Sequence, residues 1–178
     1  MNTIEDPELA ALRKAVLNDP RNGELRYLLA AHMAQAQDYD GAVLEFSAAV
    51  ALNPQLHAAR LQLGLLHLTM AQPQHSLAVL EPLEALDEDA ALKHFKRGLE
   101  ALIADDFDAC IGHLRTGLAL NTTNPPLNRD MAMLIERVLA ATQTQGTASR
   151  QPASSSEPQE ATSEAVRTDF SLYGLTRH

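Results

Sequence analysis

The 178-residue sequence has no tryptophan, a single cysteine and only 4% aromatic residues. One cysteine, Cys110, excludes an internal disulfide and a cysteine-based metal site. No apolar run approaches the roughly 18 residues of a membrane-spanning helix, so we expect no membrane insertion. Acidic residues outnumber basic ones 23 to 14, which gives a net charge of −9. Nucleic acid and anionic lipid are therefore not expected as partners, because both need a basic surface.

Motifs that carry chemistry are also missing. The sequence has no glycine-rich phosphate loop, no His-Glu-x-x-His and no Gly-x-Ser-x-Gly motif. Its seven histidines never stand four residues apart, as a helical metal site would require. We therefore expect no enzyme activity, no catalytic residue, no metal and no cofactor. The N-terminus shows no basic and apolar segments of a Sec-type signal, so the cytoplasm is the expected compartment.

One stretch of the sequence occurs twice. Residues Asp38–Asn53 and Asp106–Asn121 align without gaps, 68 residues apart, and a weaker copy lies halfway between them. Repeats of about 34 residues that each fold as a helix pair are typical of the tetratricopeptide repeat. The 46% of hydrophobic residues are mostly small or aliphatic, which suits helices packed closely on one another.

The first repeat, residues 23–56, resembles the tetratricopeptide repeat at seven positions of the family pattern. Small residues at these positions let helix backbones approach, and large ones fill the space between them. The resemblance implies an all-α, right-handed solenoid of about three helix pairs with flanking capping helices. The matching residues are Leu29, Ala30, Met33, Ala42, Phe46, Ala49 and Pro54.

Two further repeats follow with weaker matches. The second, from His57, has Pro82 inside its second helix, and we expect that helix to kink or restart there because proline removes a backbone hydrogen bond. The third begins near Ala91 and has Cys110 where the first repeat has Ala42, so we expect a buried, unreactive thiol. His67, at a repeat-core position, is interpreted as a packed histidine.

Helices are also predicted on both sides of the repeats. Residues 8–18 carry apolar side chains at helical spacing and form a degenerate repeat helix or a cap. Residues 125–142 form the last helix, which is expected to cover the open end of the last repeat. Its apolar stripe consists of Leu127, Met131, Leu134, Ile135 and Val138.

The acidic residues at the repeat turns are interpreted as helix N-caps. Asp38 and Asp40 in the first repeat have counterparts in Asp106 and Asp108 in the third. Short acidic side chains at a helix start accept hydrogen bonds from free backbone N–H groups.

The family resemblance also implies a binding surface. In tetratricopeptide repeats, the first helix of each pair lines the concave face, and here those positions are mostly apolar. They lack the Lys, Asn and Arg residues that clamp a terminal carboxylate in some family members. Two alternatives stay open, namely a groove that binds an apolar peptide and a tighter superhelix that buries these side chains as core. The predicted groove residues are Tyr27, Leu61, Leu65, Leu68, Phe95, Leu99 and Leu102.

The composition changes after the last helix. We predict a solenoid with its caps over 1–142, a disordered linker over 143–165 and a short apolar motif over 166–178. The motif could dock on the groove of its own chain, on a second copy or on another protein. Its apolar residues are Phe170, Leu172, Tyr173 and Leu175.

These features indicate a protein–protein interaction module that binds an apolar segment of a protein or peptide. In architecture the chain is similar to the translocator chaperones of type III secretion, which implies an adaptor or chaperone of a bacterial secretion or surface-assembly system. The alternative is a structural subunit of a larger assembly, anchored through its C-terminal motif.

Overall fold

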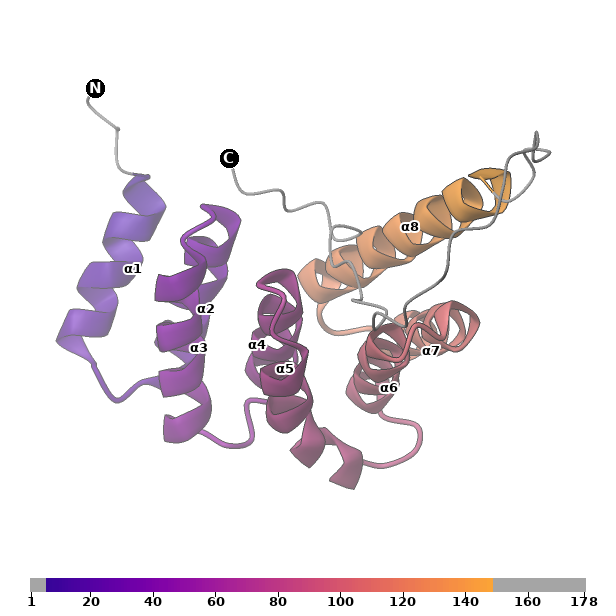
Figure 1. Ribbon diagram of the computed structural model, residues 1–178. Coiled ribbons are helices and arrows are strands. Elements are labelled where there is room, and N and C mark those ends of the chain that lie inside the picture. The colour runs from indigo at the N-terminus through magenta and orange to yellow at the C-terminus, as the bar shows by residue number, and fades with distance from the viewer. Residues whose placement is uncertain (1–5, 149–178) are drawn as a thin grey trace.

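The computed structural model describes residues 6–148, which form an all-α structure of successive helix pairs (Figure 1). The pairs α2/α3, α4/α5 and α6/α7 are the three predicted repeats, and α1 and α8 flank them, so the predicted fold class is confirmed. The elements are α1 (Pro7–Asn18), α2 (Gly23–Gln35), α3 (Tyr39–Leu52), α4 (His57–Thr69), α5 (Pro73–Leu80), the 3-10 helix η1 (Glu81–Ala85), α6 (Ala91–Ile103), α7 (Phe107–Leu120) and α8 (Pro125–Ala148).

The backbone repeats with the period read from the sequence. Gln37, Ala71 and Asp105 lie 34 residues apart, each in the turn inside a helix pair, and each has a positive φ of 57–64°. In each turn the next residue donates its backbone N–H to a carbonyl five residues back, at 2.8–2.9 Å. This is the left-handed turn that commonly ends a helix. Three identical turns show that the three helix pairs share one geometry.

Within each pair the helices meet at a residue with little or no side chain. Ala30, Gly64 and Gly98 occupy equivalent positions and are all buried. A Cβ atom added to Gly64 would lie 2.6 Å from the Leu80 side chain, and one added to Gly98 would lie 2.7 Å from Leu114. The first-repeat residues that match the family pattern are buried as expected, apart from Pro54 in its exposed turn.

Two of the four predicted N-cap residues cap helices α3 and α7, whereas Asp40 and Asp108 lie in the first turns of these helices. The Asp38 carboxylate accepts a hydrogen bond from the Gly41 N–H at 3.1 Å, and the Asp106 carboxylate accepts one from the Ala109 N–H at 3.0 Å. Cys110, in the following helix, is completely buried. Burial and the nearby Asp106 charge raise the pKa of its thiol to about 11, so little of it is thiolate at neutral pH.

Two hydrophobic clusters form the core. The N-terminal cluster joins α1 to α4 around Phe46, and the C-terminal cluster joins α4 to α8 around Phe95. The predicted apolar stripe of α8 is buried in the C-terminal cluster. Helix α8 runs to Ala148, six residues past its predicted end; the sequence has no proline between Pro126 and Pro152 to stop it.

The second repeat is irregular at its proline. Helix α5 ends at Leu80, and a 3-10 helix, η1, carries the chain onward through Pro82. This confirms the expected restart. Because Leu83 in η1 is fully buried in the C-terminal cluster, the segment still contributes to the core.

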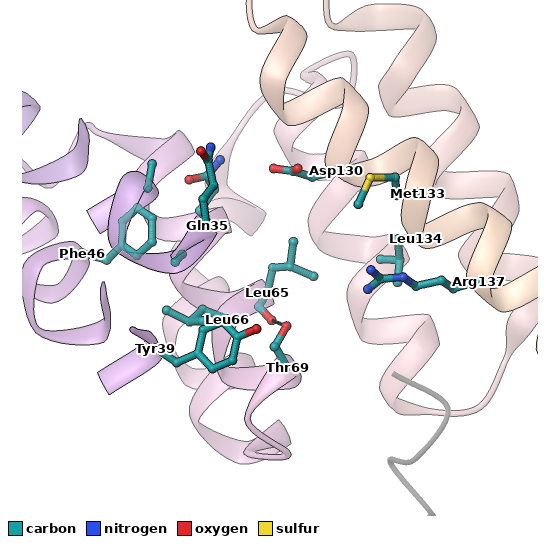
Figure 2. A pocket seen from close by; sticks show the side chains of 13 residues that line it. Gln35, Tyr39, Phe46, Leu65, Leu66, Thr69, Asp130, Met133, Leu134 and Arg137 are labelled. Atoms are coloured by element: carbon teal, nitrogen blue, oxygen red, sulfur yellow. Dashed lines mark hydrogen bonds between the residues drawn. The ribbon is translucent and has the colours of Figure 1, made fainter. Parts of the chain in front are cut away.

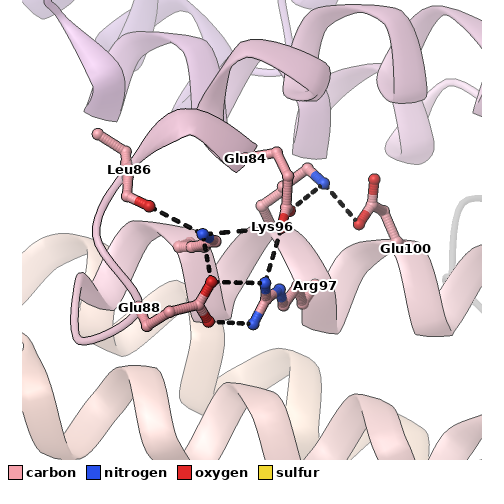
Figure 3. A network of polar contacts seen from close by, with 7 residues as sticks. Glu84, Leu86, Glu88, Lys96, Arg97 and Glu100 are labelled. Atoms are coloured by element: carbon pink, nitrogen blue, oxygen red, sulfur yellow. Dashed lines mark hydrogen bonds and ion pairs between the residues drawn. The ribbon is translucent and has the colours of Figure 1, made fainter.

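A network of ion pairs fastens this irregular segment to α6 (Figure 3). Lys96 and Arg97 of α6 each donate to Glu84 at 2.7 Å. Lys93 and Arg97 donate to Glu88, at 2.6 and 2.8 Å. The two carboxylates thus connect the segment after α5 to three side chains of α6.

The two lysines of this network are almost completely buried, at 5% exposure each. The Lys93 ammonium also donates to the Leu86 carbonyl at 2.8 Å, and that of Lys96 to the Glu100 carboxylate at 2.9 Å. Burial alone would lower the pKa of Lys96, but its hydrogen bonds to Glu84 and Glu100 outweigh burial and raise it. Both lysines are therefore held as buried cations with partners, as such groups require.

Substitutions of two glycines in α7 would test the packing of α7 against α6. A Cβ at Gly117 would lie 2.4 Å from the buried ring of Phe95, whereas one at exposed Gly112 would meet nothing within 4 Å. We expect Gly117→Ala to lower the free energy of unfolding by about 1–3 kcal/mol through overpacking. Gly112→Ala should raise it by about 1 kcal/mol, because alanine favours helix. Urea unfolding followed by circular dichroism measures both, and changes of the same sign would contradict this packing.

The ion-pair network predicts an acid-dependent stability. Hydrogen bonds from Arg97 and Lys96 lower the pKa of Glu84 from 4.5 to about 2. The folded state therefore gains stability from Glu84 above pH 4.5 and loses it as the pH falls towards 2. Glu84→Gln should be less stable than wild type at pH 6, and the difference should shrink towards pH 2.5.

Glu81→Gln is the matched control, because Glu81 is exposed in the same 3-10 helix and no ion pair of the described residues includes it. It should follow the wild-type urea-unfolding profile at every pH. A difference between Glu84→Gln and wild type that stays constant from pH 6 to 2.5 would contradict the role of the Glu84 charge.

Candidate functional site

A cleft of about 410 Å³ opens between the repeat helices and α8 (Figure 2). We call it the α2–α4–α8 cleft. Helices α2 and α4 form one side, with two residues of α3 behind them, and α8 forms the other. Its lining residues are Ala31, Ala34, Gln35, Tyr39, Phe46, Gln62, Leu65, Leu66, Thr69, Asp130, Met133, Leu134 and Arg137.

The middle of the cleft is apolar. In Figure 2, Leu65 of α4 lies opposite Leu134 and Met133 of α8. Leu65 is partly buried and Met133 is 42% exposed, so both offer apolar surface to a ligand. The Thr69 hydroxyl donates to the Leu65 carbonyl at 3.0 Å and is therefore already satisfied. The cleft is thus suited to one or two large apolar side chains.

Two opposite charges stand on the α8 side of the cleft. Asp130 and Arg137 are seven residues apart, which places them on one face of the helix with a rise of about 10 Å between them. Burial raises the pKa of Asp130, and the adjacent Arg129 lowers it in part. Among the described residues, neither side chain has a hydrogen-bond or ion-pair partner. Both charges are therefore available to a bound segment.

The structure places most of the predicted groove residues in the core. Leu61, Leu68, Phe95, Leu99 and Leu102 are at most 3% exposed and belong to the C-terminal cluster. These five residues fit the alternative of a tighter superhelix that buries them as core. Neighbouring repeats and α8 contribute to the same cluster and cover them. They are not accessible to a peptide in this structure.

The other two predicted groove residues are partly buried. Leu65 lines the cleft, whereas Tyr27 packs with its ring tilted against Phe46, 6.0 Å between ring centres. That a peptide contacts either residue stays a prediction. The predicted C-terminal motif, with Phe170 to Leu175, lies outside the described residues.

Sequence reasoning missed the α8 side of the cleft. The sequence predicts that the α8 stripe covers the last repeat, and that prediction does not include Asp130, Met133 or Arg137. Their spacing of three and four residues was the available signal, because it places them on one face beside the stripe. An apolar Met133 outside the buried stripe also pointed to a second contact surface.

The histidine and metal-site predictions concern residues outside the cleft. His67 is packed as predicted, 8% exposed, with its Nδ1 2.8 Å from Oε1 of Gln72. Within residues 6–148, no three His, Cys, Asp or Glu side chains are grouped so that they could hold a metal ion. In that same part of the chain, no helix is long and apolar enough to cross a membrane.

The fold matches that of MamA, a tetratricopeptide repeat protein. A structure of MamA from residue 41 to its end, from Desulfovibrio magneticus RS-1, superimposes with a TM-score of 0.51 and 20% sequence identity, covering 79% of this chain and 77% of that one. The ArsTM double mutant of RS-1 MamA superimposes with a TM-score of 0.51 and 19% sequence identity, covering 78% of this chain and 85% of that one. No protein-family model and no curated protein matches the sequence. At this identity, the likeness shows the fold alone.

Two neighbouring leucines of α4 test whether the cleft, rather than a wider groove, is the open surface. Leu65 lines the cleft, whereas Leu68 is 1% exposed in the core. We expect Leu65→Glu to remain folded, with a loss of about 1–2 kcal/mol for part of a leucine's burial. Leu68→Glu should unfold the domain, because an unpaired buried charge costs more than 4 kcal/mol. Equal destabilisation in urea would refute the assignment.

Proposed function

We propose that this chain is a protein interaction module, an adaptor or chaperone-like protein, that binds an apolar segment of a partner in the α2–α4–α8 cleft. The observation that carries the proposal is an apolar cleft on the inner side of a tetratricopeptide repeat scaffold, between Leu65 and Met133. Scaffolds of stacked repeats offer such concave surfaces to other polypeptides. The cytoplasm, and a bacterial secretion or surface-assembly system, are the setting that we propose for it.

The size of the cleft limits what the partner inserts. A volume of about 410 Å³ is that of a small-ligand site. It therefore takes one or two large side chains of a short segment and leaves the rest of the partner outside. Met133 suits this role, because the flexible and polarisable methionine side chain adapts to different apolar shapes.

The partner should also carry charge. Asp130 and Arg137 flank the apolar middle of the cleft on α8. A basic side chain near Asp130 and an acidic one near Arg137 would select the orientation of the bound segment, because complementary charges fix register more than they add affinity. We therefore propose an apolar segment with charges of opposite sign at its two ends.

Site-specific photocrosslinking tests the function. Benzoylphenylalanine would replace Met133 in the cleft, and Leu44 of α3 in the control, since Leu44 is 71% exposed and does not line the cleft. After irradiation in cells of the source organism, the Met133 position should give discrete protein adducts that Leu44 does not give. Leu65→Glu should reduce these adducts at least tenfold, and the crosslinked peptides should be apolar.

Two results would contradict the function. One is the same set of adducts from the Met133 and Leu44 positions. The other is adducts at Met133 that persist at wild-type level in Leu65→Glu while the variant remains folded by circular dichroism.

A further inference from the structure

Two apolar features of this chain have no assigned occupant or target. One is the α2–α4–α8 cleft, and the other is the C-terminal cluster of large apolar residues, Phe170, Leu172, Tyr173 and Leu175. Helix α8 links them, because it forms one side of the cleft and is joined to the C-terminal segment by residues 149–168. This inference rests on the proposed function, since it concerns the same cleft.

We propose that the chain's own C-terminal segment, residues 169–178, occupies the α2–α4–α8 cleft and competes there with the partner. The cleft would then be covered in the free protein, and a partner would bind by displacing the segment.

The length of the chain permits this contact. From Met133 to Ala148, α8 rises by about 22 Å, at 1.5 Å per residue. The 22 residues from Ala148 to Phe170 can span up to roughly 70 Å when extended. The segment can therefore return to the cleft with chain to spare. Tethering gives it an effective concentration on the order of millimolar, so even a weak contact would be well populated.

The charges of the segment match those of the cleft. Asp169 precedes the apolar residues and Arg177 follows them. On α8, Asp130 and Arg137 stand at the two ends of the apolar wall, both without a partner among the described residues. A segment that binds as a helix, antiparallel to α8, brings Arg177 to Asp130 and Asp169 to Arg137, because eight residues rise by about 12 Å in a helix and Asp130 and Arg137 are about 10 Å apart along α8. Charge-assisted hydrogen bonds of this kind are stronger than neutral ones and fix orientation.

A spin label on the full chain tests the contact. Ser171→Cys would carry a nitroxide in a Cys110→Ala background, since alanine occupies the equivalent place in the first repeat. The methyl signals of Leu65 and Met133 should lose at least half their intensity, whereas that of Leu44, outside the cleft, should be retained. Tenfold dilution should leave the effect unchanged, because the contact is within one chain.

A charge exchange tests the orientation. Asp130→Arg should restore most of the lost intensity at Leu65 and Met133, by repelling Arg177. Adding Arg177→Asp to the same protein should bring the broadening back. Broadening unaffected by the single change, or not recovered in the double variant, would overturn the proposed register.

Two outcomes overturn the occupancy itself. Equal intensities at Leu65, Met133 and Leu44 would show that the segment does not reach the cleft. Broadening that disappears on dilution, and that passes from spin-labelled to unlabelled copies in a mixture, would assign the cleft to a second copy instead. Neither outcome affects the crosslinking to a partner at Met133, so failure of this inference is distinguishable from failure of the proposed function.

Discussion

The close approach of two helices inside each repeat is the constraint on which the rest of this structure depends. Ala30, Gly64 and Gly98 stand at the same place in successive repeats, and a Cβ on either glycine would collide with a leucine of the facing helix. Because cores are packed as densely as organic crystals, such contacts fix the distance and angle between helices. The identical left-handed turns follow from this shared geometry, and so does the direction of the concave face.

The position of helix α8 determines how much of the concave face is open. Its stripe completes the C-terminal cluster, and its adjacent face forms the cleft. Leu66 belongs to the N-terminal cluster and Leu134 to the C-terminal one, and both line the cleft. The cleft therefore lies at the junction between the two parts of the core. A segment bound there would contact both, and so would stabilise their arrangement as well as gain its own affinity.

The sequence predicted what is periodic and local, and not what depends on the placement of α8. Repeat spacing predicted the helix pairs, and Pro82 predicted the break in the second repeat. Both features depend on residues that are close in the chain. The groove assignment assumed an open concave face. The repeat spacing correctly places Leu61 and Phe95 on the first helix of their repeats. It does not predict that neighbouring repeats and α8 bury them. For the same reason the sequence alone does not place Asp130 and Met133 at a cleft, because their role there depends on the position of α8.

We infer that the repeats have a closed core with a small cleft, in place of an open apolar groove. A soluble gadolinium chelate added to the methyl-labelled full chain tests it most directly, because it relaxes methyl groups that solvent can approach. We expect the methyl groups of Leu61, Leu68 and Leu99 to be as protected as those of Leu114 in the core, while those of Leu44 relax strongly. Relaxation of Leu61, Leu68 and Leu99 comparable to that of Leu44 would show an open groove and would rule out a closed core.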